Sequence, residues 1–221
     1  MNRTFINKLS PAERPDINLG YMRLSDSAPI ILAQELGLYS DYGLNVSLHR
    51  EVSWANIRDK MIAGAFDASQ MLAPMGMATT LGAAGIRAPI ISGLVLSLNG
   101  NGITLSSSLW NKLQIDSSAD TYDPIISACA LKSEIDKTGR QLTFASVHNF
   151  STHTLLLRRW LELGGIDPDQ DARIIVLPPE QMVDSLAQGV IDGFCVGEPW
   201  NSIDVEYGAG VLATTGVRLW N

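Results

Sequence analysis

Cysteine is scarce in this chain of 221 residues, and no apolar run reaches the roughly 20 residues that a membrane-spanning helix needs. The two cysteines, Cys129 and Cys195, lie in the apolar contexts SACALK and DGFCVG. A disulfide between them is one interpretation, but two buried thiols are favoured, because free cysteine behaves as a small apolar residue. There is no C-x-x-C pair and no zinc-ligand spacing, so the sequence predicts no zinc site.

Positive charge is also in short supply. The chain has 16 Lys and Arg against 23 Asp and Glu, which gives a net charge of −7 at pH 7. Because contacts to a nucleic-acid backbone are built from Lys and Arg, this balance argues against nucleic acid as a partner. It does not exclude a small anion, because the local dipole at a helix N-terminus can hold one.

The first 16 residues lack the apolar segment and the cleavage site of a signal peptide. They are polar and contain Pro11 and Pro15, so we expect residues 1–16 to form a flexible arm. The sequence as written therefore predicts a cytoplasmic protein, unless an export segment lies outside it.

The composition that remains is that of a globular protein, with 46% hydrophobic and 18% charged residues. In the first half, strands and helices are expected to alternate, which favours a mostly parallel sheet with helices on both sides. The run PIISGLVLSL is almost continuously apolar, as in a strand buried on both faces. The expected strands are 17–24, 44–48, 66–72 and 89–98, and the expected helices are 29–38, 54–63 and 74–84.

The sequence Asn99-Gly100-Asn101-Gly102 interrupts this pattern with residues that tolerate positive φ, and we place a lobe boundary there. The second half again predicts an α/β lobe, so the expected layout is two α/β lobes with a ligand cleft. Its expected strands are 103–106, 141–147, 172–178, 191–197 and 208–215, and its expected helices are 107–113, 124–137, 152–163, 179–188 and 198–205.

The stretch from Glu51 to Met75 carries the first candidate site residue. Ser53 is expected to cap a helix, which Gly64 would end at positive φ. Trp54 then lies in the first turn, beside the end of the following strand. Ligands of open α/β sheets bind outside the carboxyl ends of strands, so Trp54 is either a cleft wall or a core residue.

Two helix N-termini are further candidates. Hydroxyls and free amides in the sequence SDSAP favour an anion, although the residues alone favour a simple cap formed by Ser25, Asp26 or Ser27. His153 falls in a first turn, where the helix dipole disfavours imidazolium, so a neutral ring could donate one hydrogen bond to an oxyanion. Thr152 would be a second donor, and the alternative is an ordinary surface histidine.

The segments that connect the two lobes supply the remaining candidates. Glu198 and Trp200 in GEPWN, and Asn101 in NGNGITLS, are expected to line the cleft. The alternative is a hinge with a packed Trp. The nearby methionines, including Met71, Met75 and Met77, are expected to be packing residues.

The sequences SWANIRDK, MLAPM, NGNGITLS and FCVGEPWN closely resemble the nitrate- and bicarbonate-binding proteins of bacterial ABC transporters, and related cytoplasmic nitrate and nitrite sensors. The resemblance runs from about Asn18 to Asn221. It implies a type II periplasmic-binding-protein-like α/β fold that closes by a hinge, with Trp54 and His153 at the ligand. The implied lobes are residues 17–100 with 197–221, and residues 101–196, with the strand GAGVLATT inserted into the first lobe.

The resemblance also implies a function and a partner. The chain would be the substrate-binding component of an ABC-type uptake system for a small oxyanion, nitrate or nitrite first and bicarbonate second. Its partner would be a membrane permease and its location periplasmic. The alternative is a cytoplasmic sensor that acts on a regulatory protein.

An enzyme is the alternative of a different class, because proteins that make the thiamine pyrimidine share the implied fold. The chain lacks their cysteine-rich segment, and it has no G-x-S-x-G, H-E-x-x-H or P-loop motif. We therefore expect no catalysis, no cofactor and no metal.

Chains of the resembled family continue well beyond the position of Asn221. In its nitrate-binding members a Lys that faces the anion follows the motif at Leu219–Asn221 by a few residues. Relative to that family, the chain is expected to be C-terminally truncated.

Overall fold

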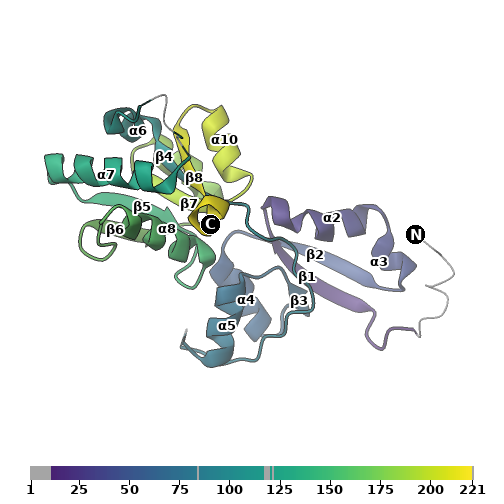
Figure 1. Ribbon diagram of the computed structural model, residues 1–221. Coiled ribbons are helices and arrows are strands. Elements are labelled where there is room, and N and C mark those ends of the chain that lie inside the picture. Colours follow the sequence, from purple (N-terminus) through teal and green to yellow (C-terminus); the bar gives the residue numbers. More distant parts are fainter. Residues whose placement is uncertain (1–10, 84, 117–119, 121, 221) are drawn as a thin grey trace. The chain divides into compact units, whose positions relative to one another are not determined.

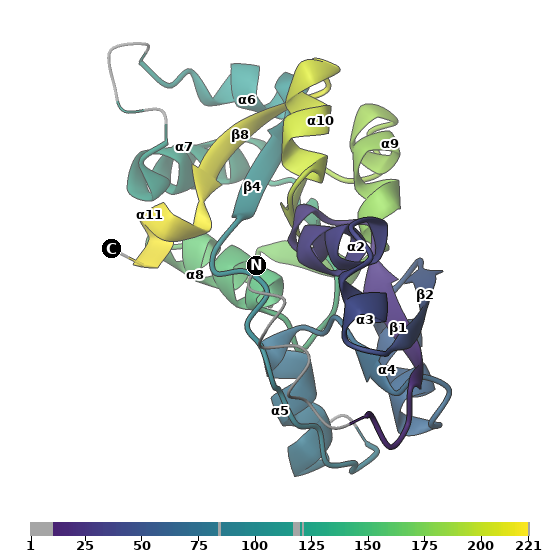
Figure 2. The same cartoon turned by 90° about the vertical axis from the view of Figure 1, so that its right-hand side faces the viewer.

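A computed structural model describes residues 11–83, 85–116, 120 and 122–220 (Figure 1). The chain divides into two compact units, Met1–Met71 and Leu72–Asn221, which we call unit 1 and unit 2. Figure 2 shows the elements of both units from another side. The break between the units thus precedes the boundary expected at Asn99–Gly102. The arm expected at residues 1–16 lies mostly outside the described residues.

Unit 1 is a three-stranded parallel sheet with helices, and its strand order is β2-β1-β3. The central strand β1 pairs along its full length with β2 and only briefly with β3. Its elements are β1 (Asp16–Met22), the 3-10 helix η1 (Ser25–Ser27), α2 (Ala28–Glu35), α3 (Leu38–Asp41), β2 (Asn45–Glu51), α4 (Trp54–Ile62) and β3 (Ala68–Ser69).

Local signals determine both ends of α4, as the sequence predicted. The Ser53 hydroxyl accepts a hydrogen bond from the backbone N–H of Asn56 at 3.2 Å. Gly64 follows the last turn at φ +72°, a conformation that costs little only for glycine. The helix packs closely on the sheet, because a Cβ on Gly20 would lie 3.1 Å from the Ile57 side chain.

The strand expected at 66–72 is reduced to Ala68–Ser69. On either side of this short strand, side chains and not backbone carbonyls accept hydrogen bonds from the backbone N–H groups of β1. The Asp67 carboxylate accepts from the Asn18 N–H at 2.9 Å, and the Gln70 side-chain oxygen accepts from the Met22 N–H at 2.7 Å. The pairing therefore continues through side chains, which a pattern of apolar residues does not reveal.

Unit 2 contains a five-stranded mixed sheet with the order β6-β5-β7-β4-β8. The strands β6, β5 and β7 are parallel, and β4 is antiparallel to β7 and β8. Its elements are α5 (Ala73–Leu81), β4 (Asn101–Ser106), α6 (Ser107–Leu113), α7 (Pro124–Thr138), β5 (Leu142–Ser146), α8 (Thr152–Leu163), β6 (Ala172–Val176), the 3-10 helix η2 (Pro179–Gln181), α9 (Met182–Ala187), β7 (Gly193–Gly197), α10 (Trp200–Glu206), β8 (Gly210–Thr215) and α11 (Gly216–Trp220).

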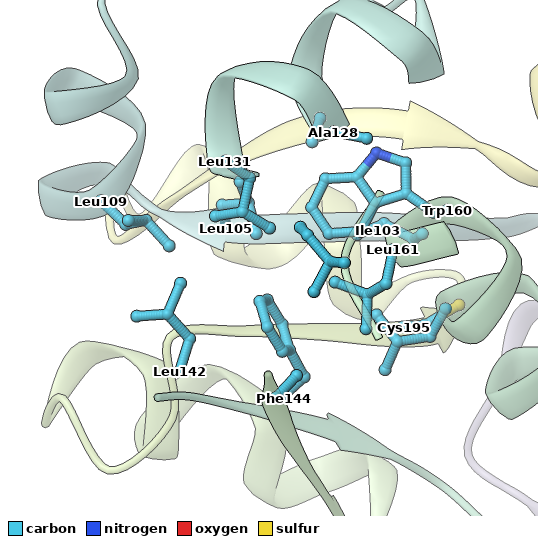
Figure 3. Close-up of a cluster of buried hydrophobic side chains, with 14 of the residues drawn as sticks. Ile103, Leu105, Leu109, Ala128, Leu131, Leu142, Phe144, Trp160, Leu161 and Cys195 are labelled. Atoms are coloured by element: carbon cyan, nitrogen blue, oxygen red, sulfur yellow. The ribbon is translucent and has the colours of Figure 1, made fainter. Parts of the chain in front are cut away.

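The core of unit 2 lies between one face of this sheet and the helices α6, α7 and α8 (Figure 3). Phe144 from β5 meets Trp160 from α8 edge to face, with ring centroids 6.1 Å apart. The Trp160 indole N–H donates to the Ser127 hydroxyl at 3.0 Å, so its one polar atom is satisfied inside the core. Most of the remaining members of the core are aliphatic side chains from β4, α6, α7 and α8, and single residues come from β5, β6, β7, β8 and α11.

Two expectations for unit 2 were wrong. The run at 89–98, expected as a buried strand, has no regular secondary structure, and its large apolar side chains are mostly exposed. Apolar character by itself does not supply the partner strand on which a β-strand depends.

Cys129, expected to be buried, is exposed on α7, whereas Cys195 is buried, and both are free thiols. Burial raises the pKa of the Cys195 thiol.

The strand GAGVLATT was expected in the first lobe, but β8 pairs with β4 in the sheet of unit 2. The helix α10 precedes it and packs on the opposite face of this sheet from the aliphatic core. The Asn201 side chain connects these elements, because its oxygen accepts from the Thr104 hydroxyl and its amide donates to the Val196 carbonyl, both at 2.9 Å. These buried bonds hold residues 197–215 to unit 2.

Candidate functional site

The residues expected at a ligand fall into two groups, one in each unit. The unit 1 cluster comprises the expected residues Ser25, Asp26, Ser27 and Trp54 together with Gln70, which was not expected, all at or just after the carboxyl ends of β1, β2 and β3. The unit 2 cluster comprises Asn101, Thr152, His153, Glu198 and Trp200, at the edge of the sheet where β5 and β7 end and β4 begins.

In the unit 1 cluster, Gln70 connects two strand ends and was missed in the sequence. Its side-chain oxygen accepts from the Met22 N–H, and its amide donates to the Asp26 carboxylate at 2.6 Å. Burial raises the pKa of Asp26, and the hydrogen bonds that the carboxylate accepts oppose this rise. The sequence signal that could have identified Gln70 as a site residue is its position as a polar residue directly after the short strand in FDASQML.

The helix α2 begins without a side-chain cap, so the expected capping by Ser25, Asp26 or Ser27 was wrong. The Ser27 hydroxyl instead donates to the Leu24 carbonyl at 2.7 Å. The 3-10 turn η1 replaces the capping box at this helix start, because the Ser27 N–H also donates to the Leu24 carbonyl at 3.1 Å.

Trp54 is only 1% exposed, and its indole N–H has no hydrogen-bond partner among the described residues. The Ser69 hydroxyl is also buried and without a partner in this part of the chain. Ser69 is in register with Gly20, and a Cβ on Gly20 would point towards α4. The Ser69 side chain therefore lies on the same side of the sheet as Trp54. Buried polar groups without partners are rare, so the two are candidates for ligand contact.

Lys60 on α4 forms an ion pair with the buried Glu51 carboxylate. The Asn56 amide also donates to Glu51, at 3.3 Å. The positive charge of Lys60 is therefore already paired and does not face a ligand.

In the unit 2 cluster, three strands bring Asn101, Gly197 and Thr215 to one edge of the sheet. Asn101 is in register with Gly197, and its neighbour Gly102 is in register with Thr215. The helix α8 starts beside them, because a Cβ on Gly216 would lie 3.2 Å from Leu156 of α8 and 3.9 Å from the Asn101 Cβ. His153 precedes Leu156 by three residues and so lies on the same face of α8.

His153 is buried, and its Nδ1 atom has no hydrogen-bond partner among the described residues. Burial lowers the pKa of His153 to about 4, so the ring is neutral at pH 7. A neutral imidazole carries one N–H donor and one acceptor, and the tautomer decides which nitrogen donates. The ring can therefore donate one hydrogen bond to a ligand without adding a charge.

The loop before His153 is held rigidly by hydroxyl groups. The Ser151 hydroxyl caps α8 by accepting from the Thr154 N–H at 3.1 Å. The Thr154 hydroxyl donates to the His148 carbonyl at 2.8 Å and contacts the Ser146 hydroxyl at 2.7 Å. Thr152 takes no part in this network, so the helix start is fixed without it.

The turn GEPWN carries two more expected residues. A carboxylate oxygen of Glu198 accepts from the Ser202 N–H at 3.2 Å, which satisfies the start of α10. Trp200 is 7% exposed at the first position of α10. This burial agrees with the packed-Trp alternative for the connecting segment.

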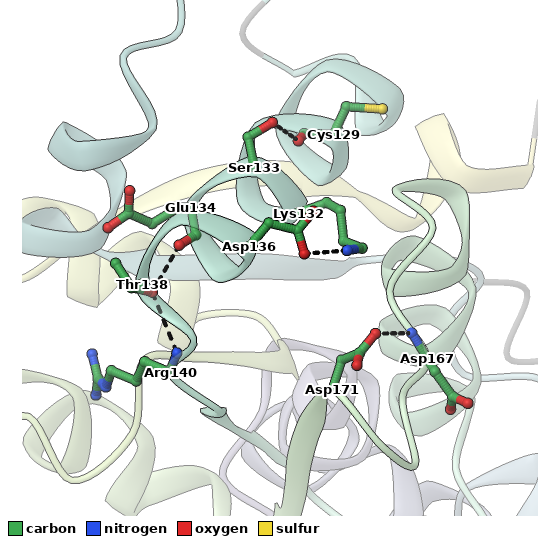
Figure 4. A network of polar contacts seen from close by, with 9 residues as sticks. All are labelled: Cys129, Lys132, Ser133, Glu134, Asp136, Thr138, Arg140, Asp167 and Asp171. Atoms are coloured by element: carbon green, nitrogen blue, oxygen red, sulfur yellow. Dashed lines mark hydrogen bonds and ion pairs between the residues drawn. The ribbon is translucent and has the colours of Figure 1, made fainter.

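A depression where α7 ends is lined by Ile135, Asp136, Gly139, Arg140, Gln141, Gln170 and Asp171. Its charged groups are already engaged: Arg140 pairs with Asp192 at 2.8 Å, and Asp136 pairs with Lys132. Figure 4 shows the polar contacts around this helix end. The depression therefore offers few free groups to a ligand.

Among the described residues, no three His, Cys, Asp or Glu side chains are grouped as a metal ion would require. In the same part of the chain, no helix combines the length and the apolar character needed to cross a membrane.

Comparison with known proteins identifies relatives along almost the whole chain. It is 41% identical over 212 residues to the nitrate import ATP-binding protein NrtC of Synechocystis, and 37% identical over 213 residues to the nitrate/nitrite-binding protein NrtA of Synechococcus elongatus. These matches cover 95% and 92% of this chain but 30% and 46% of the relatives. The chain thus spans less than half the length of either relative.

Solved structures show the same fold. The periplasmic nitrate-binding protein NrtA of Synechocystis superposes with a TM-score of 0.83 at 31% identity, over 93% of this chain and 52% of that chain. The ligand-binding component of an ABC-type import system from Staphylococcus aureus reaches a TM-score of 0.72 at 20% identity, which supports the fold alone. The expected periplasmic-binding-protein-like fold is confirmed.

The family assignment rests on the match to a sequence model over residues 10–221, which is nearly the entire chain. The relatives include nitrate-binding components of ABC transporters, which are substrate-binding proteins, as the motifs around Trp54, Asn101 and Trp200 indicated. On this evidence the chain belongs to the NMT1-like family and is homologous to the nitrate-binding components of ABC nitrate transporters.

Proposed function

We propose that the chain binds a small planar oxyanion, nitrate or nitrite first and bicarbonate second, as a substrate-binding component of an ABC-type uptake system. Binding takes place without catalysis, and the partner that reads the bound state is a membrane permease. Bicarbonate remains the second ligand because the chain is 40% identical to bicarbonate transport proteins named CmpC.

The observation that carries the proposal is the state of His153. The ring is buried at the start of α8, its Nδ1 has no partner among the described residues, and its pKa of about 4 keeps it neutral. A buried polar atom without a partner costs about 1–3 kcal/mol, which an oxyanion contact would recover. The helix N-terminus adds a favourable dipole for a negative charge.

Two side chains of unit 1, Trp54 and Ser69, supply donors of the same chemical kind. The Trp54 indole N–H and the Ser69 hydroxyl are buried without partners in the described part of the chain. Each can donate to an oxygen acceptor, and neither carries a charge. In this proposal the ligand is recognised mainly by neutral donors and helix dipoles. Asn101, Thr152 and Glu198 are the further ligand-lining residues that we propose.

Thermal unfolding with nitrate, nitrite, bicarbonate, sulfate and chloride tests the proposal. A ligand that binds only the folded state adds about 2.7 kcal/mol of stability at a hundredfold excess over its Kd. We expect a rise in Tm with nitrate or nitrite, no rise with chloride, and a weaker rise or none with sulfate.

Three histidine variants provide matched controls. His153→Gln keeps an amide donor and should retain part of the nitrate-dependent rise, whereas His153→Leu has no donor and should lose it. His49→Gln changes a histidine of unit 1 that contacts the Asn18 side chain at 2.9 Å, and it should leave the rise unchanged. Cooperative unfolding with no anion-dependent shift in the unsubstituted chain would contradict the proposal.

A further inference from the structure

Asp26 places a carboxylate in the part of unit 1 where the proposed anion would bind. It lies in the 3-10 turn η1, shortly after the central strand β1 of the parallel sheet. Trp54 follows β2 and Ser69 ends β3, so the two candidate donors of unit 1 belong to the strands on either side. Ligands of open α/β sheets bind outside the carboxyl ends of strands, so a carboxylate at this edge affects which anion is bound.

A buried glutamine fixes the position of this carboxylate. Gln70 is 2% exposed, and its side-chain oxygen accepts from the Met22 N–H at 2.7 Å. Because a backbone N–H can only donate, this contact turns the amide nitrogen of Gln70 towards Asp26, to whose Oδ1 it donates at 2.6 Å. All three residues belong to unit 1, so the arrangement does not depend on any other segment of the chain.

The carboxylate held in this way can accept further hydrogen bonds but cannot donate any. An ionised carboxylate has about four acceptor positions, and the Gln70 amide occupies one of them on Oδ1. The Asp26 side chain is half-buried, so the remaining positions face the sheet edge and not the core. The positive charge of Lys60 does not neutralise Asp26, because Lys60 pairs with Glu51.

The two anions of the proposed function differ in the one property that such an acceptor detects. Nitrate and bicarbonate are both planar and singly charged, but nitrate has only acceptor oxygens, whereas bicarbonate has one O–H group. Beside nitrate, the Asp26 carboxylate is a second negative charge with no proton between the two groups. Beside bicarbonate, it can accept a short charge-assisted O–H···O⁻ hydrogen bond, which is about twice as strong as a neutral one.

We propose that Asp26 is a specificity-determining residue that favours an oxyanion carrying a proton, such as bicarbonate, over one that carries none, such as nitrate. Gln70 is the positioning residue that holds it. The neutral donors Trp54 and Ser69 serve both anions alike, so Asp26 is what admits bicarbonate as a second ligand. This inference rests on the proposed function, because it concerns the ligands of the same site.

Isothermal titration calorimetry of the full chain with nitrate and with bicarbonate, at a pH where bicarbonate is the main carbonate species, tests the proposal. Asp26→Asn keeps the shape of the side chain, removes its charge and adds an amide donor. The Kd for bicarbonate should rise at least ~10-fold and the Kd for nitrate should fall, because a hydrogen bond to a charged group is lost for one anion and a repulsion is lost for the other.

Asp59→Asn is the matched control. It removes the same charge from unit 1, but Asp59 is an exposed residue of α4 that pairs with Arg58. Both Kd values should therefore stay unchanged in this variant. A change in total charge alone would instead affect the two aspartate variants equally.

Gln70→Met tests the positioning role with a second variant, because Met is of similar length and has no amide. The ratio of the bicarbonate Kd to the nitrate Kd should rise in this variant as well, by less than in Asp26→Asn. A merely structural role of Gln70 would weaken both anions equally and leave this ratio unchanged.

The outcomes separate this inference from the proposed function. If both anions bind and Asp26→Asn leaves the ratio of the two Kd values unchanged, Asp26 does not determine specificity, and the proposed function is unaffected. If the parent chain unfolds cooperatively but binds neither anion, the proposed function fails and this inference fails with it.

Discussion

Replacing Asp204 by Asn tests how unit 2 tolerates a buried acid. Asp204 lies on α10 and is fully buried, and neither carboxylate oxygen has a hydrogen-bond partner among the described residues. The Gly210 backbone and the side chains of Thr104 and Leu186 lie around it, since a Cβ on Gly210 would meet the side chains of Asp204, Thr104 and Leu186. Burial raises the pKa of Asp204 to about 6 from its ordinary value of 3.8.

The sign of the pH effect follows from this raised pKa. The folded state holds a proton on Asp204 more tightly than the unfolded state does. The resulting stability is complete below pH 3.8 and is lost as the pH rises through about 6. A rise in pKa of this size corresponds to about 3 kcal/mol by pH 7.5. Asn has the same shape and no charge, so Asp204→Asn should raise the free energy of unfolding by about 2–3 kcal/mol at pH 7.5.

The assay is urea unfolding between pH 4 and pH 8, followed by tryptophan fluorescence. The advantage of the Asn variant should be largest at pH 7.5 and should shrink towards zero near pH 4. Asp136→Asn is the control, because Asp136 is an exposed partner of Lys132 on α7 and its loss should change stability by less than about 1 kcal/mol. An Asn variant with no advantage at pH 7.5, or with an advantage that is independent of pH, would refute the reasoning.

Three further predictions concern helix starts and packing. His153→Gln should gain about 3 kcal/mol of stability relative to the parent chain as the pH falls from 6.5 through about 4 in equilibrium unfolding, because burial lowers the pKa of His153 and protonation of this histidine destabilises the parent over that range. Ser53→Ala should lower the free energy of unfolding by about 1 kcal/mol in urea titrations, because it removes the cap of α4. Gly164→Ala should lower Tm, at a cost of about 1–3 kcal/mol, because its Cβ would lie 2.4 Å from the Ala128 carbonyl oxygen, whereas Gly93→Ala meets nothing within 4 Å and should change stability by less than about 1 kcal/mol.

His153 and Asp204 oppose each other between about pH 4 and pH 6.5. As the pH falls, His153 removes stability and Asp204 restores it, because burial lowers one pKa and raises the other. The parent chain should therefore show a flatter pH dependence than either variant. Flat profiles in both variants would contradict this account.

The helices of this protein could be predicted from the sequence because their boundary signals are local. Asp123 caps α7 through the N–H groups of Ile125 and Ile126, and Ser151 caps α8 through Thr154. Gly139 ends α7 at φ +63°. Each of these signals acts within about four residues of the helix end, so the sequence pattern contains the necessary information.

The candidate site was predicted in part. The positions of Trp54 and His153 at helix starts followed from their neighbours. The structure adds that both are buried and that each has a nitrogen without a partner among the described residues. Gln70 was missed because its role depends on Met22 and Asp26, which lie 48 and 44 residues away. Capping by Ser27 was wrong, because the chain forms a 3-10 turn in which the hydroxyl donates to a carbonyl.

The sequence by itself determined most of the helices and strands, the caps of α4, α7 and α8, and the family to which the chain belongs. The tertiary structure alone decided which strands pair and which polar groups are buried. It placed β8 beside β4, left residues 91–98 without a backbone-to-backbone hydrogen bond to the described residues, and enclosed Asp204 under α10. The physical reason is that a helix satisfies its backbone within one segment, whereas a strand and a buried charge depend on groups far away in the sequence.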